Sequence, residues 1–280
     1  MRRGAGILIG LTVLATVGPF LVSQSPVAQD RNTIYSPPSL DDHPFGTDGL
    51  GRDMLSRSLH AARYSWATAW AGVALTIFLG TLAGAVSGLV GGNVDRAVMR
   101  GTELFMAFPA LYLFLALRNL FPDELTPVES GVIVVTSLAT VGWCSVARFV
   151  RGQVLEVRER DYVTAAAAFG ATRRHVIRVH VLRALGPVLL LQAGLLFPYF
   201  VLGEVTLSFL GLGLQEPYPS WGNMLASSVG SLFVLREYWW CWLAPAMFLT
   251  VASLGANLGF EGIRERIKTA SVLARRRGNR

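Results

Sequence analysis

The chain has 280 residues, of which 52% are hydrophobic and only 15% are charged. Soluble domains carry about 25% charged residues, so this composition excludes an ordinary soluble protein and favours a membrane protein. The formal net charge of +7 at pH 7 would suit nucleic-acid binding, but no basic face with interleaved aromatic residues is present. We therefore expect no nucleic-acid partner, and we expect membrane lipid to surround much of the chain.

Six apolar segments are long enough to be transmembrane helices. Crossing the hydrocarbon core of a bilayer takes about 20 mainly apolar helical residues, because unpaired backbone polar groups are costly there. The sequence thus predicts an all-α, polytopic membrane protein with about six spans. These are expected at about Ala5–Ser23, Trp66–Gly91, Val98–Leu120, Ser130–Val150, Leu185–Leu210 and Trp239–Gly259.

Two of these segments differ from a typical span. The first follows two arginines and precedes small residues, a pattern that also suits a cleaved signal peptide. Its apolar run is longer than the usual signal core of about 7 to 15 residues, and cleavage would leave an odd number of spans. The fifth is interrupted by Pro187, Pro198 and Glu204. We expect both to be spans, with a signal peptide as the alternative for the first.

The placement of arginine predicts the orientation of the spans. Arginine is concentrated in the N-terminal tail, after the second span, after the fourth span and in the C-terminal tail. On the opposite side, arginines are offset by aspartate and glutamate. This is the positive-inside pattern, which predicts that both termini are cytoplasmic.

Polar side chains inside the expected spans are candidates for a translocation path. An ionisable group in hydrocarbon is costly unless it faces water or a partner, so Glu103 and Glu204 are functional candidates. Alternatively, Glu103 is solvated near the inner interface, and Glu204 makes a structural hydrogen bond to another subunit. Asn257 is a third candidate, although Asn257 and Gln192 also suit hydrogen bonds between helices. The two cysteines fall in expected spans, and no disulfide, metal site or catalytic group of residues is indicated.

The polar segments divide the chain into two regions. Residues 1–65 are expected to form the first span and an extracytoplasmic segment, in which a short amphipathic helix begins at Asp53 and lies against the bilayer or the bundle. In that helix Leu59 lies on the apolar face, and Arg57 lies on the polar face. Residues 66–280 are expected to form a five-helix core with a large cytoplasmic loop at 152–183.

The residues of this loop predict a helix that ends at a sharp corner. Ala165–Ala168 are the strongest helix formers available, and Glu159 and Asp161 suit the N-terminus of a helix. Gly170 suits the left-handed position that ends a helix, and Thr172 can cap a second helix with its hydroxyl group.

Two interpretations of this loop remain open. Arg174 and Arg178 of the second helix could reach the lipid headgroups, which would make the loop a membrane-surface element. The small side chains of Ala165 and Ala166 instead allow another backbone to approach closely. This patch favours docking on a separate protein.

At these residues the sequence resembles the permease subunits of ATP-binding-cassette importers, specifically the second, C-type permease of the dipeptide, oligopeptide and nickel group. The cytoplasmic motif of that family is Glu-Ala-Ala, three residues, Gly, nine residues, Ile, one residue, Leu-Pro. The corresponding residues here are Thr164, Ala165, Ala166, Gly170, His180 and Leu182. Tyr162–Ala166 and Phe169–Thr172 are also similar to the Tyr-Val-x-Ala-Ala and Leu-Gly-Ala-Ser that are common in the peptide group. Arg183 and Ala184 depart from it, because the group usually has Pro-Asn there.

Three more stretches, spread over nearly the whole chain and in the expected order, carry the same resemblance. His43–Arg57 is similar to the signature that follows the first span of the group. Leu207–Gly213 with Pro219–Leu225 is similar to the signature at the end of the fifth span, and Gly91–Pro109 also fits.

The resemblance implies a type I importer permease fold and ATP-driven import of peptides or related small solutes across the bacterial inner membrane. It implies three kinds of partner: a second permease subunit, one or two cytoplasmic ATPases, and an extracytoplasmic substrate-binding protein. The chain has no Gly-rich phosphate loop, and its single lysine is Lys268 in the tail. ATP and Mg²⁺ are therefore expected on the ATPase, with no cofactor or catalytic residue on this chain. The residues implied in coupling to the ATPase are Glu159, Asp161, Tyr162, Ala165, Ala166, Gly170, Thr172 and Leu182.

Two function classes remain as alternatives to the importer subunit. An ATP-independent secondary transporter or channel would show charged residues at the membrane midplane or inverted repeats, and neither is apparent. A membrane-embedded enzyme would need a metal site, or a nucleophile with a base, inside the spans. The cargo stays open between dipeptides, longer peptides, nickel complexes and glutathione-like molecules.

Overall fold

The computed structural model describes residues 2–122, 125–170, 172 and 182–278. All regular elements in this part of the chain are helices, which confirms the all-α prediction. They are α1 (Arg2–Val17), η1 (Gly18–Phe20), η2 (Arg31–Thr33), α2 (Met54–Val90), α3 (Gly92–Ala107), α4 (Ala110–Arg118), α5 (Pro127–Arg158), α6 (Asp161–Ala168), α8 (Leu182–Phe209), α9 (Trp221–Val229), α10 (Leu232–Glu237) and α11 (Trp240–Gly278).

Four helices are long and apolar enough to cross a membrane on their own: α2, α5, α8 from Leu185 and α11 as far as Gly262. Helices α3 and α4 reach the required length only as a pair, and they are bent by 91°. The span expected at Val98–Leu120 is therefore interrupted by a bend. Proline disfavours helical geometry in the residue before it, and Phe108 before Pro109 is accordingly extended, with φ −81° and ψ 132°.

The first expected span is a shorter apolar helix, Gly6–Phe20. At a rise of 1.5 Å per residue this segment is about 22 Å long, less than the hydrocarbon thickness of about 30 Å. It packs along α11, where a side chain added at Gly259 would lie 2.2 Å from Leu8 Cγ. The close approach to α11 explains how this short helix is held in the bundle.

Helix α2 joins two elements that were expected to be separate. The Asp53 carboxylate caps its N-terminus by accepting a hydrogen bond of 2.7 Å from Ser56 N. No glycine or proline interrupts residues 54–71, so the outer helix continues directly into the span. Together they form one helix of 37 residues. The expected boundary between residues 65 and 66 lies inside this helix.

Helices α2 and α5 form the most extensively packed pair. Gly80, Gly84 and Gly88 recur every four residues on α2 and face α5. A methyl group at Gly84 would lie 2.3 Å from the carbonyl oxygen of Ala147, so only glycine allows this approach. The spacing is the small-residue pattern that brings membrane helices close together.

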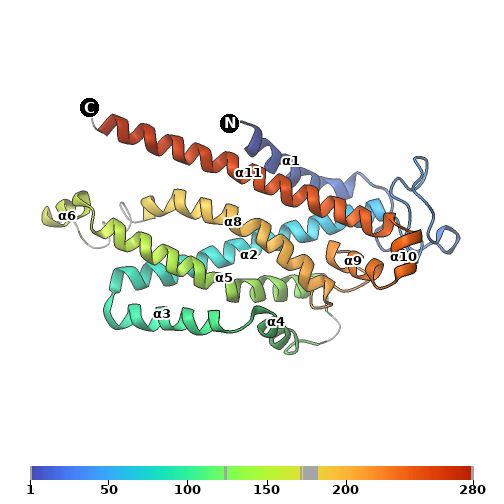
Figure 1. The fold of residues 1–280 in the computed structure, drawn as a ribbon, viewed down its shortest axis with the longest axis horizontal. Coiled ribbons are helices and arrows are strands. Elements are labelled where there is room, and N and C mark those ends of the chain that lie inside the picture. Colours follow the sequence, from blue (N-terminus) through green and yellow to red (C-terminus); the bar gives the residue numbers. More distant parts are fainter. Residues whose placement is uncertain (1, 123–124, 171, 173–181, 279–280) are drawn as a thin grey trace.

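Figure 1 shows the long helices lying along the long axis of the molecule, with α6 at one end and α9 and α10 at the other. The end of α11 lies at the α6 end, whereas α1 starts near the middle of the long axis and runs toward the end that carries α9 and α10. Helix α8 is continuous through Pro187 and Pro198 and places the buried Phe197 and Phe200 in the core. Its Phe197 ring contacts Trp66 of α2 edge to face, at 4.7 Å between centroids.

Candidate functional site

The expected docking loop begins with α6, which is fixed to the bundle by apolar packing. Only Glu159 and Arg160 separate the end of α5 from the start of α6. Val163 of α6 is buried in a cluster with Val157 of α5 and Leu185 of α8. Because buried contacts transmit displacement, a movement of α6 must also move the ends of α5 and α8.

The opposite face of α6 is exposed. Tyr162 is half exposed, Ala165 and Ala168 are exposed, and Phe169 has 92% of its surface exposed. Phe169 was not among the predicted coupling residues, although an apolar residue directly before the corner glycine was the available signal. An exposed aromatic ring beside small side chains is typical of a protein contact surface.

The remaining loop residues are placed as follows. Gly170 has φ +84°, the left-handed conformation that was predicted for it. Asp161 lies in the first turn of α6, whereas Glu159 ends α5 instead of opening the loop helix. Ala166 is half buried, Thr172 is exposed and Leu182 begins α8. The second loop helix, with His180, lies outside the described residues, and Arg183 and Ala184 form part of the first turn of α8.

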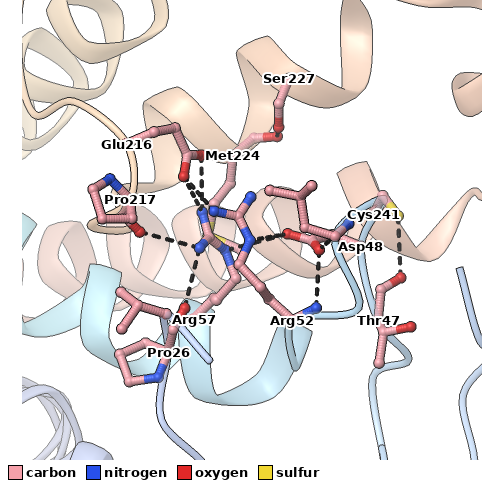
Figure 2. Close-up of polar contacts among 12 residues, drawn as sticks. Pro26, Thr47, Asp48, Arg52, Arg57, Glu216, Pro217, Met224, Ser227 and Cys241 are labelled. Carbon is pink, nitrogen blue, oxygen red and sulfur yellow. Dashed lines mark hydrogen bonds and ion pairs between the residues drawn. The ribbon is translucent and has the colours of Figure 1, made fainter. Parts of the chain in front are cut away.

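A group of charged residues that includes two buried arginines lies around the start of α2 (Figure 2), at the end of the molecule opposite to α6 (Figure 1). We call Asp48, Arg52, Arg57 and Glu216 the outer polar cluster. Arg57 Nη2 donates to Glu216 Oε1 at 3.0 Å, and Arg52 Nη1 donates to Glu216 Oε2. Arg52 Nε donates to Asp48 Oδ2 at 2.6 Å. Arg57 also donates to the carbonyl oxygen of Pro26 at 3.1 Å, so the cluster ties together three separate segments.

Burial and the neighbouring charges have opposite effects on the pKa of Arg52. Burial alone would lower the pKa of its guanidinium group, but the hydrogen bond to Glu216 and the charges of Asp48 and Glu216 raise that pKa above its ordinary value. Because this pKa is raised, the stabilisation is fully present below the ordinary pKa of arginine and is lost only above it. The ion pairs of Arg52 therefore persist throughout the physiological pH range.

The outer polar cluster joins two stretches that lie far apart in the sequence and that both carry the resemblance to the permease family. Asp48, Arg52 and Arg57 belong to the stretch His43–Arg57, whereas Glu216 lies between Leu207–Gly213 and Pro219–Leu225. Arg57 was expected on the polar face of an amphipathic helix, but it is only 1% exposed. The prediction was wrong because Glu216, 159 positions along the chain, supplies the missing partner.

The candidates inside the bundle fall in three different environments. Glu204 is fully buried, and its carboxylate accepts hydrogen bonds from Ser65 Oγ at 2.5 Å and Ser208 Oγ at 2.7 Å. Its partners thus lie within this chain. Glu103 is exposed on α3, on the same face as Arg96 and Arg100.

Asn257 does not form the bond between helices that we expected. Its Nδ2 donates to the carbonyl oxygen of Ser253, one turn earlier in the same helix, at 3.0 Å. Asn257 and Gln192 instead line a cavity of about 280 Å³ between α8 and α11. In the part of the chain that the structure describes, no group of His, Cys, Asp and Glu side chains could hold a metal ion.

Comparison with known proteins agrees with this architecture. The family model described as "Binding-protein-dependent transport system inner membrane component" matches residues 77–269. The dipeptide transport system permease protein DppC of Bacillus subtilis is 36% identical over 94% of this chain and 79% of its own length. The probable D,D-dipeptide permease DdpC of Escherichia coli is 36% identical, over 93% and 84%. The oligopeptide permease OppC of Haemophilus influenzae is 32% identical, over 92% and 81%.

These matches confirm the resemblance to C-type permeases. They also confirm that the chain is a transport subunit rather than an enzyme, and they rule out the alternative of an ATP-independent secondary transporter or channel. The chain belongs to the family of binding-protein-dependent transport system inner membrane components, as a multi-pass permease subunit.

Proposed function

We propose that this permease imports peptides or related small solutes, driven by a separate cytoplasmic ATPase that docks on the exposed face of α6. The face carrying Ala165, Ala168 and Phe169 is the observation that supports docking. It is exposed on one side and packed against α5 and α8 on the other, so a partner bound there would move the bundle. ATP and Mg²⁺ bind to the ATPase, and this chain holds neither.

The ends of the molecule fit this arrangement. The end of α11 and the α6 loop share one end, and the start of α1 is the end of that helix nearer to them. Arginine is concentrated in the segments on this side. We place this end, with both termini, in the cytoplasm. The outer polar cluster then faces outward, where it orders the surface that receives the extracytoplasmic binding protein.

The charged face of α3 supports a translocation path beside this helix. Arg96, Arg100 and Glu103 are all exposed in the single chain. Charged side chains are costly in hydrocarbon, so this face meets water or the second permease rather than lipid. We place Glu103 on the path between the two permeases. There its carboxylate would attract the amino terminus of a peptide.

The docking proposal is tested by retention of the ATPase on the purified permease. Burying a phenylalanine side chain contributes about 1.5–3 kcal/mol, so Phe169→Ala should weaken the complex by at least about tenfold. Phe233→Ala is the matched control, because Phe233 is 63% exposed on α10 at the opposite end. Co-purification in mild detergent, with the ATPase titrated, measures the affinity. Equal affinities for wild type and Phe169→Ala would contradict docking on this face.

A further inference from the structure

Three arginines on one face of α5 form hydrogen bonds to neighbouring helices. Arg148, Arg151 and Arg158 are spaced by three and seven residues, which puts them on one side of the helix. We call them the arginine face of α5. In the sequence they count only as positive charge on the cytoplasmic side, and no role in transport distinguishes them from the other arginines.

The central contact of this face joins α5 to α3. Arg151 Nε and Nη2 donate to the two carboxylate oxygens of Asp95, at 2.5 and 2.6 Å. Ser87 of α2 donates a further hydrogen bond to Asp95. A two-pronged arginine–carboxylate pair fixes both distance and orientation, so Asp95 holds the start of α3 against α5 and α2 together.

Two more contacts extend the connection in both directions. Arg148 Nε donates to Thr102 Oγ1 of α3 at 3.1 Å, two turns further along that helix. Arg158 Nη1 donates to the carbonyl oxygen of Gly88 near the end of α2 at 2.6 Å. Helix α5 thus holds the last turn of α2 and about half the length of α3.

These contacts are too exposed to serve mainly as stabilising ion pairs. The side chains of Asp95 and Arg151 are 19% and 33% exposed, and partly solvated pairs contribute little to the free energy of unfolding. Their positions are more informative, because all three contacts join α5 to the two helices that meet at one corner, α2 and α3. That corner turns sharply at Gly91 and Gly92, which both have positive φ.

We propose that the arginine face of α5, above all Arg151 with Asp95, transmits movement from α6 to α3. This inference rests on the proposed docking of an ATPase on α6, because α5 leads into α6 through only Glu159 and Arg160. Movement received by α6 displaces the end of α5, and the arginine contacts carry the α2–α3 corner with it. Helix α3 carries the exposed Glu103, so the charged face of α3 moves with the ATPase. Asp95 and Arg151 are positioning residues that contact neither nucleotide nor cargo.

The test uses the complete transporter, reconstituted in vesicles with its second permease, ATPases and binding protein. Arg151→Met and Asp95→Asn should retain the ATPase and its basal hydrolysis, while ATP-driven uptake of a radiolabelled dipeptide falls. The expected fall is about 2- to 30-fold, the range for residues that couple distant sites. The double exchange Asp95→Arg with Arg151→Asp should recover a substantial part of the uptake, which a purely structural defect would not.

Glu156→Gln is the matched control for these variants. It removes an ion pair of the same 2.5 Å length, between Glu156 of α5 and Arg160 in the connection to α6, that joins α5 to neither α2 nor α3. Uptake by this variant should equal that of wild type. If wild type itself retains no ATPase, the proposed function fails. If wild type works and Arg151→Met takes up dipeptide equally well, the transmission role is contradicted. Loss of the ATPase from both Arg151→Met and Asp95→Asn would also contradict it, because transmission follows docking.

A distance measurement tests the same claim independently of uptake. Spin labels can be attached at Gly101→Cys on α3 and Gly152→Cys on α5, where an added Cβ has nothing within 4 Å. In the otherwise unchanged chain, the distance distribution between the labels should stay the same with and without ATP. With Arg151→Met it should broaden or shift in the ATP-bound state. An unchanged distribution in that variant would show that the arginine contact does not join the two helices in motion.

Discussion

Gly170 is a residue at which the backbone conformation, and not the available space, favours glycine. Its φ is +84°, and a Cβ placed on it would have nothing within 4 Å. Substitution there changes the backbone conformation without causing a clash. Most residues lose about 1–2 kcal/mol in this left-handed region, whereas Asn enters it more readily. The corner after α6 thus depends on conformational preference and not on space.

We therefore predict different outcomes for two substitutions of Gly170. Gly170→Val should disrupt the corner after α6 and lower cargo-stimulated ATP hydrolysis by about tenfold, the effect of about 1.4 kcal/mol. Gly170→Asn should keep most of the activity, since Asn tolerates a positive φ. Stimulated ATP hydrolysis in reconstituted vesicles measures both. Equal losses in the two variants would show that the backbone conformation is not the cause.

A second prediction for a single residue concerns Arg57. Its guanidinium group is 1% exposed and bonds Glu216 and the carbonyl oxygens of Pro26 and Pro217. Arg57→Met would leave partly buried acceptors unpaired, which costs about 1–3 kcal/mol of stability. Glu216→Gln should cost less, because this side chain is 44% exposed and glutamine keeps one acceptor oxygen for the arginines. In detergent, the midpoint temperature of thermal unfolding should therefore be highest for wild type, lower for Glu216→Gln and lowest for Arg57→Met. A midpoint for Arg57→Met at or above that of Glu216→Gln would contradict the buried role.

At the scale of elements, the contact between α2 and α5 holds the bundle together. Gly84 is the tightest point, because a Cβ there would lie 2.3 Å from the Ala147 carbonyl oxygen. Gly84→Leu should force the helices apart and lower stability by at least about 1–3 kcal/mol, the usual cost of overpacking. Gly152→Leu on α5 is the control, since a Cβ there meets nothing within 4 Å. The unfolding midpoint of each purified variant measures the difference. Similar midpoints would show that this glycine contact is dispensable.

The elements also show how far the sequence determines the fold. Apolar windows located α2, α5, α8 and α11, because length and hydropathy alone define a span. They did not find the break at Phe108–Pro109, since hydropathy is insensitive to a backbone bend. The corner at Gly170 followed from local preference, whereas Phe169 was missed because its exposure depends on how α6 packs. The pairing of Arg57 with Glu216 is a contact over 159 positions, which no local pattern reports.

At the scale of the whole molecule, the arrangement of the two ends predicts the orientation in the membrane. Leu40 is 95% exposed at the end that carries the outer polar cluster, and Ala168 is exposed on α6 at the other end. The native cysteines Cys144 and Cys241 are buried. In spheroplasts that express this chain alone, a membrane-impermeant maleimide should label Leu40→Cys directly. It should label Ala168→Cys only after permeabilisation. The reverse pattern would contradict cytoplasmic termini.

The central claim is that α6 is the contact through which an ATPase drives this permease. Replacing Phe169 with a photoreactive phenylalanine analogue in the assembled transporter tests that contact most directly, and the same analogue at Leu40 is the control. After illumination, the position on α6 should give a covalent product that contains the ATPase subunit, and Leu40 should give none. An assembled, active transporter with no ATPase product from position 169 would contradict the account.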